Sequence, residues 1–204
     1  MIQNSVFKKS VAVLVSGFAL LTMNSCGPKA FTKGDYDNVE KENLLNDQWS
    51  ETDMQKAVKD LVDSLVASPV VAEAKRPPVV IVTNLQNKTS EHIDTQNIMD
   101  MVRVELTNRG KVAFVDKEAR GDISDEYQYQ AGNASAETRK GPGGQTGADF
   151  VLNGRLDSIV QEVGRDKTVY YKLTLNLTNL KTSVISWTNY KQMRKKFSKQ
   201  RISM

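Results

Sequence analysis

Apolar residues recur at the spacing of one helix face between residues 54 and 66. Ser50-Glu51-Thr52-Asp53 precedes them and resembles a capping box with Asp in the place of Glu, and Pro69 follows them. We therefore predict an amphipathic helix that ends before Pro69. Such a stripe of Met and aliphatic side chains indicates core packing more often than a groove for a partner. Its members are Met54, Ala57, Val58, Leu61, Val62, Leu65 and Val66.

A strand, a helix and a second strand are predicted next. Residues 79–85 are apolar on both faces and rich in β-branched side chains, which is typical of a central strand that is covered on both sides. The following helix ends at Gly110, because Gly can adopt the left-handed conformation that caps a helix. Residues 111–116 form the next strand, so a right-handed crossover is expected. The apolar positions of this helix are Ile98, Met101, Val102 and Leu106.

The second half of the chain predicts a helix and three strands. Residues 117–147 indicate a helix followed by a flexible Gly-rich loop, and residues 148–156 a third strand. Strict alternation over residues 168–178 predicts a long strand with one solvated face. A turn at residues 181–183 leads into residues 184–188, whose Ile185 and Trp187 we expect in the core. The basic segment 191–201 is typical of a solvated terminus rather than a site for an acidic partner.

The first 25 residues have the pattern of a secretory signal peptide. Lys8 and Lys9 precede an apolar run from Val11 to Leu21, which is too short to span a membrane. The only cysteine, Cys26, follows directly, as in a bacterial lipoprotein signal whose thiol is acylated; Ser25 fits that signal, whereas Met23 and Asn24 depart from it. The alternatives are a plain signal peptide and a buried helix with an incidental Cys.

We therefore predict a lipoprotein signal peptide at residues 1–25, lipid attachment at Cys26, a flexible tether at residues 26–49 and a globular domain at residues 50–204. About 22 tether residues reach at most about 75 Å, and about 25 Å as a random coil. Loss of Lys8 and Lys9 lowers the formal net charge from +4 to +2. The remaining charge indicates no nucleic-acid partner.

Candidate catalytic and metal-binding groups are sparse. His92 is the only histidine and has no Cys beside it, so neither a zinc site nor a catalytic triad is indicated. The loop 141–147 lacks the Gly-Lys-Ser/Thr of a phosphate-binding loop and precedes a strand. Asp125 and Glu126 are adjacent and point apart on a helix, which disfavours the carboxylate pair of a glycosidase. A pair of carboxylates from distant segments is left as an alternative. The sequence favours a binding module over an enzyme and predicts no catalytic residue, metal or cofactor.

Six short motifs stand in order along the chain: Arg76–Val82, Asn87–Thr89, Asn108–Lys111, Gly147–Gly154, Tyr170-Tyr171 and Ile185–Trp187. In this order and spacing they resemble the LpoB family of penicillin-binding-protein activators over about residues 50–190. The resemblance implies an outer-membrane lipoprotein, facing the periplasm, that binds and activates a bifunctional penicillin-binding protein, a peptidoglycan synthase. It also implies an α+β or α/β fold similar to the N-terminal domain of TolB, a mixed sheet of four to five strands flanked by helices.

Besides the irregular lipoprotein signal, the chain departs from the family at two places, of which the second bears on function. Ser183 stands in the turn before Ile185 where the family usually has Gly, and the tether is short where the best-known members have a long Pro-rich one. The alternative function is that of a structural or accessory lipoprotein in an envelope or secretion assembly of the curli-secretion type. Membrane-spanning strands need about 10 residues, and only residues 168–180 approach that length, so we favour the activator. The resemblance assigns no partner-binding residue.

Overall fold

The computed structural model describes residues 34–199. The chain divides into two compact units, Met1–Asn38 and Val39–Met204. The described part of the first unit, residues 34–38, is irregular and exposed, and every helix and strand below belongs to the second unit. The predicted signal peptide and Cys26 lie outside the described residues.

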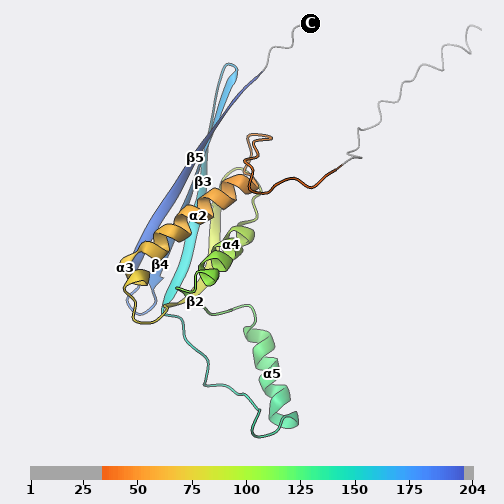
Figure 1. The fold of residues 1–204 in the computed structure, drawn as a ribbon, viewed down its shortest axis with the longest axis vertical. Helices are drawn as coiled ribbons and strands as arrows, with labels where there is room; N and C mark the ends of the chain where they lie inside the picture. The colour runs from red at the N-terminus through yellow and green to blue at the C-terminus, as the bar shows by residue number, and fades with distance from the viewer. Residues whose placement is uncertain (1–33, 200–204) are drawn as a thin grey trace, which may run out of the picture. The chain divides into compact units, whose positions relative to one another are not determined.

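The second unit is built on a five-stranded mixed sheet (Figure 1). Its strands are β1 (Val79–Lys88), β2 (Ala113–Phe114), β3 (Phe150–Val163), β4 (Asp166–Asn179) and β5 (Ile185–Ser198), in the order β2-β1-β3-β4-β5. β1 runs parallel to both β2 and β3, whereas β3, β4 and β5 are antiparallel neighbours. The predicted mixed sheet of the α+β class is confirmed.

Within residues 34–199, four helices accompany the sheet: α2 (Glu51–Ala67), α3 (Pro69–Ala72), α4 (Thr95–Asn108) and α5 (Arg120–Asn133). The predicted capping box starts α2, since the Ser50 hydroxyl accepts a hydrogen bond from the Asp53 amide and the Asp53 carboxylate accepts one from the Ser50 amide. Gly110 has a φ of +63° after α4, as the sequence predicts. α5 is present as expected and has no buried residue.

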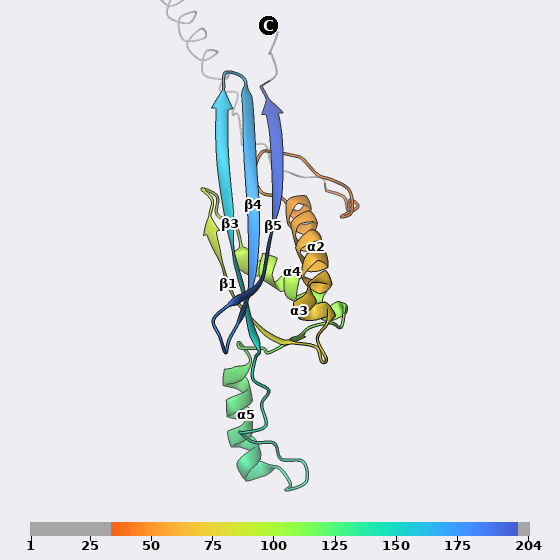
Figure 2. The ribbon, with the colours of Figure 1, turned by 90° about the vertical axis from the view of Figure 1, so that its left-hand side faces the viewer.

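The core lies between one face of the sheet and the helices α2 and α4 (Figures 1 and 2). Apolar side chains of α2 and α4 meet alternate residues of β3 and β4 there. The opposite face of β4 carries partly exposed residues from Tyr170 to Thr178, so its predicted solvated face is confirmed. Core members include Leu61, Leu65, Ile98, Val102, Leu106, Leu152, Leu156, Leu173, Leu175 and Leu177.

The position predicted for β1 is wrong in two respects. β1 lies second from the edge, beside the two-residue β2, and β3 is the central strand. Its Val80 is buried, but Ile81 and Thr83 are partly exposed. The physical reason is that α2 and α4 lie on the same face, so the other face of β1 has no helix of the described chain over it.

One glycine is required by packing. The pairing of β1 with β3 shifts register between Val82 and Leu85, opposite Gly154. A Cβ atom on Gly154 would lie 2.2 Å from the carbonyl oxygen of Thr174 and 2.7 Å from a methyl carbon of Leu175. Only glycine therefore allows β3 and β4 to approach this closely at the irregularity.

The C-terminal strands are longer than predicted. β3 continues past Leu156 to Val163, and the segment predicted as a solvated basic terminus is strand β5 as far as Ser198. β3, β4 and β5 each have 14 residues. Strand length therefore does not distinguish a synthase activator from a component of an envelope or secretion assembly, as it was expected to do.

The turn into β5 confirms one expectation and contradicts another. Ser183 adopts a φ of +60°, the conformation that favours Gly at this position. Trp187 packs against the core as predicted, but Ile185 is 54% exposed and does not. Ile185 lies where the pairing of β4 with β5 shifts register, which places it outside the regular inward alternation.

Candidate functional site

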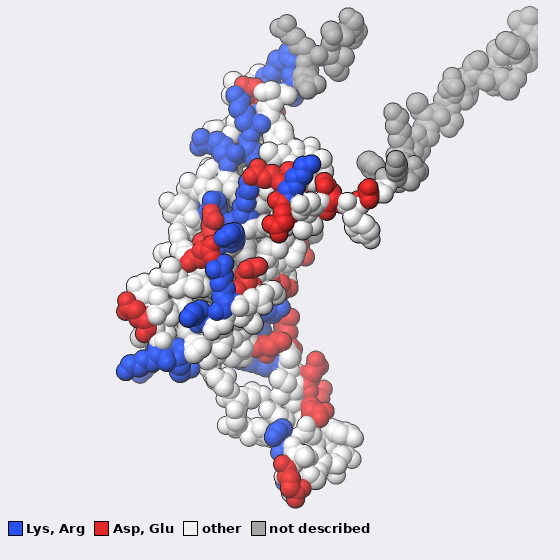
Figure 3. All heavy atoms as spheres, viewed as in Figure 1, with Lys and Arg blue, Asp and Glu red and all other residues white. Residues whose placement is uncertain are grey.

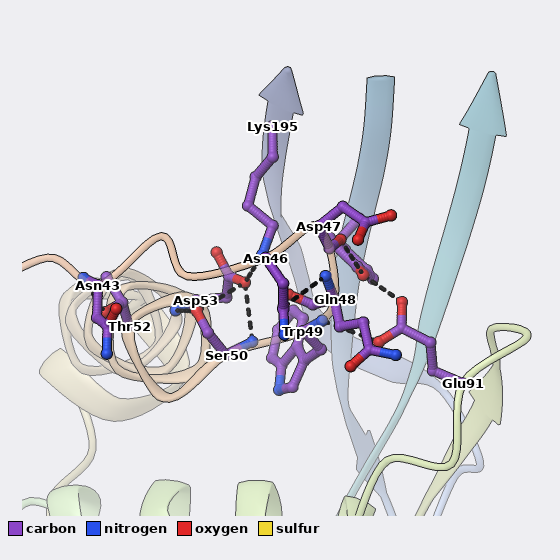
Figure 4. A network of polar contacts seen from close by, with 11 residues as sticks. Asn43, Asn46, Asp47, Gln48, Trp49, Ser50, Thr52, Asp53, Glu91 and Lys195 are labelled. Atoms are coloured by element: carbon purple, nitrogen blue, oxygen red, sulfur yellow. Dashed lines mark hydrogen bonds and ion pairs between the residues drawn. The ribbon is translucent and has the colours of Figure 1, made fainter. Parts of the chain in front are cut away.

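The most elaborate polar cluster holds the chain that enters α2 (Figure 4). Residues 47–50 cross β4 and β5 on the face of the sheet that is turned toward the helices. The loop between β1 and α4 lies on the other side of this segment. We call the residues that hold this segment the entry joint. They are Asp47, Trp49, Asp53, Glu91, Tyr171 and Lys195.

Lys195 is the centre of the entry joint. Its ammonium group lies 2.7 Å from the Asp53 carboxylate, and the two side chains are only 5% and 7% exposed. It also donates to the carbonyl oxygen of Gln48 and lies 5.6 Å from the ring centroid of Tyr171. The ammonium group is therefore paired and hydrogen-bonded, as a buried charge requires, and the aromatic face adds a further favourable contact.

Asp53 joins this cation to the start of α2. One carboxylate oxygen accepts hydrogen bonds from the Ser50 amide at 3.0 Å, the Ser50 hydroxyl at 3.0 Å and Lys195. The same carboxylate completes the capping box and lies in the first turn, where the helix dipole favours a negative charge. The end of β5 is thus bonded directly to the N-terminus of α2.

Glu91 and Tyr171 hold the other side of the segment. One oxygen of the Glu91 carboxylate accepts the backbone amide of Trp49 at 2.9 Å, and the other accepts the Tyr171 hydroxyl. The Trp49 ring meets the Tyr171 ring edge to face, with centroids 5.3 Å apart. Burial, followed by the contact with Glu91, raises the pKa of Tyr171 well above its ordinary value. The hydroxyl therefore stays a hydrogen-bond donor at every physiological pH.

A more exposed ion pair extends the entry joint toward the turn between β3 and β4. The Lys167 ammonium lies 2.5 Å from the Asp47 carboxylate and 3.2 Å from that of Glu162. The hydrogen bond from Lys167 lowers the pKa of Asp47, and the same contact raises the pKa of Lys167. Both shifts favour the charged pair at neutral pH.

A hollow of about 570 Å³ borders the entry joint and contains His92, but the chemistry around it is modest. The side chain of His92 is exposed, and residues 34–199 hold no group of three or more His, Cys, Asp or Glu that could bind a metal ion. Asp125 and Glu126 lie on the exposed α5, away from this cluster. The structure therefore brings none of these sequence candidates together into a reactive site.

The remaining candidates lie on the surface or outside residues 34–199. The Gly-rich loop 141–147 is exposed, as expected of a surface loop. Cys26, the predicted lipid-attachment residue, lies outside the described residues. Within residues 34–199 no helix is long and apolar enough to cross a membrane.

Comparison with known families accounts for this fold. A family model described as "Peptidoglycan-synthase activator LpoB" matches residues 53–193. The chain belongs to the LpoB family. The match begins at the capping carboxylate of α2 and ends in β5, so it contains both core helices and the whole of β1 to β4. The resemblance stated from the sequence motifs is confirmed. No curated protein matches the chain.

Solved structures similar to this LpoB-family chain include two LpoB C-terminal domains. That from Salmonella enterica is 18% identical with a TM-score of 0.44, and that from Escherichia coli is 18% identical with a TM-score of 0.45; in both comparisons 69% of this chain and 98% of the other are covered. Lipoprotein GNA1162 from Neisseria meningitidis is 11% identical with a TM-score of 0.39, covering 62% of this chain and 88% of that one.

The entry joint was missed by reasoning from the sequence. Lys195 lies in a run of basic residues, Lys191–Lys199, and its basic neighbours gave it the appearance of a solvated residue. The usable signal was the alternation of Trp187, Met193 and Phe197 at odd positions, which extends the inward face of the strand to Lys195. Polar residues at the other inward positions obscured that alternation.

Proposed function

We propose that this LpoB-family chain is a lipid-anchored periplasmic protein of the outer membrane that binds a bifunctional penicillin-binding protein and stimulates peptidoglycan synthesis. The observation that carries the proposal is the match to the activator family over residues 53–193, which includes nearly every element that packs into the core. In this proposal the chain performs no catalysis, and Cys26 carries the lipid.

An activator of this kind acts through differential affinity. It binds the active conformation of the synthase more tightly than the inactive one and so raises the population of the active state. A tenfold shift in that equilibrium needs a preference of about 1.4 kcal/mol, which a small docking surface can supply. A rigid surface suits this role because it loses little conformational entropy on binding.

The entry joint sets how far the domain reaches from its proposed anchor. Asp47 is held by Lys167, and the Asn43 amide donates a hydrogen bond to the Thr52 hydroxyl at 3.0 Å, so the part of the predicted tether after Asn43 is already bonded to the domain. The chain from Cys26 to Asn43 reaches at most about 60 Å even when it is fully extended. The domain therefore stays close to its membrane, and the synthase must extend a domain of its own to meet it.

The sheet face opposite α2 and α4 is the surface proposed to meet the synthase. It presents Tyr170, Tyr190 and Arg194, with Tyr170 directly opposite Arg194 in the pairing of β4 with β5. Tyr190 is 56% exposed. Tyr and Arg supply much of the binding energy of protein interfaces, and no described helix occupies this face.

The first test is recovery of partners from cell envelopes with the anchored chain and with a Cys26→Ala variant. We expect a penicillin-binding protein to be recovered with the wild type and to be reduced or lost with Cys26→Ala. Recovery of further copies of the chain or of secretion components in its place would favour an assembly role and contradict the proposal.

A second test separates docking from anchoring. Tyr190→Ala should weaken binding of the purified synthase about tenfold or more, as truncation of an interface tyrosine does. Tyr129→Ala, at a 63% exposed tyrosine of α5, is the matched control and should leave binding unchanged. Equal effects of the two variants would remove the sheet face from the proposal and leave the family assignment intact.

A further inference from the structure

The turn between β3 and β4 exposes an apolar side chain at its end. Gly164, with a φ of +60°, and Arg165 form the two-residue connection, and Val163 just before them is 79% exposed. Ile159 and Val160 of the same strand are 57% and 46% exposed. We call residues Glu162–Lys167 together with Phe197–Lys199 the hairpin tip. It extends past α2 and α4 (Figures 1 and 2).

Positive side chains surround this apolar end. Neither Arg165 nor Lys199 forms an ion pair with any residue of the described range 34–199, whereas Lys196 pairs with Asp166 at 3.3 Å. The Arg165 guanidinium donates to the carbonyl oxygen of Lys199, and the Lys199 amide donates to that of Arg165 at 2.9 Å. These bonds join the Arg165 side chain to the backbone of Lys199, so two residues with cations that have no carboxylate partner within the described range lie at the turn that follows Val163, and Figure 3 shows Lys and Arg gathered at this end.

The chain that leads to the proposed anchor passes beside the hairpin tip. Asp47 is bonded to Lys167 of the tip. Asn46 and Asp47 also line a hollow of about 320 Å³ whose other walls include Arg165, Phe197 and Lys199. The tip and this part of the tether therefore lie at the same end of the domain.

We propose that the hairpin tip is a second contact between this chain and the membrane that holds its lipid, and that the surface it contacts is rich in anionic phospholipid headgroups. The inference rests on the proposed anchor at Cys26. Val163 enters the boundary between headgroups and acyl chains, while Arg165 and Lys199 lie at the depth of the phosphates. Because the tether from Cys26 to Asn43 reaches at most about 60 Å, the local lipid concentration is high and a weak contact is sufficient.

The contact can be measured in the processed chain itself. Acylation would occupy the thiol of Cys26, the only cysteine, so Val163→Cys supplies a single reactive thiol for an environment-sensitive fluorophore. The labelled lipoprotein is reconstituted in vesicles of phosphatidylethanolamine with phosphatidylglycerol, and in vesicles of phosphatidylcholine alone. Val184→Cys, at a 60% exposed valine in the turn at the other end of β4, is the matched control.

We expect a blue-shifted emission at position 163 in the anionic vesicles, reversed by salt, and none at position 184. Replacing Arg165 or Lys199 by Ser should weaken the contact about fivefold each, the factor for one cation near an anionic surface. Lys181→Ser, at an exposed lysine of the opposite turn, should have no effect.

Three results would overturn the inference. Equal emission at positions 163 and 184 in an acylated chain removes the membrane contact and leaves the proposed function standing. A shift at position 163 only after a synthase is added assigns the tip to that protein. A chain whose mass shows no lipid at Cys26 removes the anchor on which both proposals rest.

Discussion

At the scale of single residues, the described chain depends on one buried ion pair. Lys195 and Asp53 are 142 positions apart, yet the pair closes the sheet against the start of α2. Buried pairs contribute little over a well-packed apolar replacement, but removal of one partner leaves an uncompensated charge. Lys195 is therefore expected to affect stability far more than its position in a basic run indicates.

The variant Lys195→Met should lower the free energy of unfolding by about 3 kcal/mol, because Asp53 then stays buried without its cation. Lys191→Met on the same strand is the control, since Lys191 pairs with Asp60 at the surface, where side chains are 34% and 50% exposed. An exposed pair contributes less than about 1 kcal/mol. Urea denaturation measures the free energy of unfolding of both variants. Equal decreases in the two variants would contradict the assignment of Lys195 to the buried entry joint.

The outer ion pair of the entry joint predicts a dependence on acid. Because Lys167 lowers the pKa of Asp47, the stabilisation is fully present above the unfolded value near 3.9 and is lost as the pH falls through the folded value. The wild type should be more stable than Asp47→Asn at about pH 6, and the difference should vanish toward about pH 2. A difference that is constant over this range, measured by denaturation, would show that Asp47 acts without its charge.

At the scale of elements, regular patterns predicted structure and interrupted ones did not. The capping box and apolar stripe located α2, and strict alternation located β4. The strand predicted at residues 184–188 ended too early, because polar residues occupy inward positions of β5 at Asn189, Lys191 and Lys195. Their partners are Ser64, Asp60 and Asp53, all on or beside α2 and far away in the sequence. No local pattern can show that a lysine has such a partner.

For the same reason, only part of the candidate site could be predicted from the sequence. The lipid-attachment residue Cys26 could be proposed from a local motif, whereas the entry joint depends on contacts between α2, β4, β5 and the loop after β1. Glu91 illustrates this, because its two oxygens bind Trp49 and Tyr171 from segments 42 and 80 residues away. Such a cluster is visible only after the chain has folded.

A shortened chain tests whether β5 is structural along its whole length. A chain that ends after Tyr190 loses Lys195 and removes the β5 partners of β4 from Asp166 to Leu173, so β4 becomes an edge strand there. We expect it to lose the cooperative thermal transition followed by circular dichroism. A chain that ends after Lys199 keeps all of β5 and should melt like the full chain. Equal melting of the two shortened chains would contradict the role given to β5.

At the scale of the whole molecule, membership of the LpoB family and the position of the entry joint lead to one account. The family match supplies the partner class, a peptidoglycan synthase. The contacts of Asn43 and Asp47 with the domain shorten the tether and bring residues 46 and 47 beside the hairpin tip. The proposed activator therefore works close to its own membrane and presents a rigid sheet to a synthase that reaches toward it.

Activation without catalysis can be measured as the rate of glycan-chain polymerisation. A purified bifunctional penicillin-binding protein is assayed alone and with saturating amounts of the processed chain, and the chain is also assayed alone. We expect a faster rate for the pair and no polymer from the chain alone. An unchanged rate at saturating binding, or polymer formed by the chain alone, would contradict activation without catalysis.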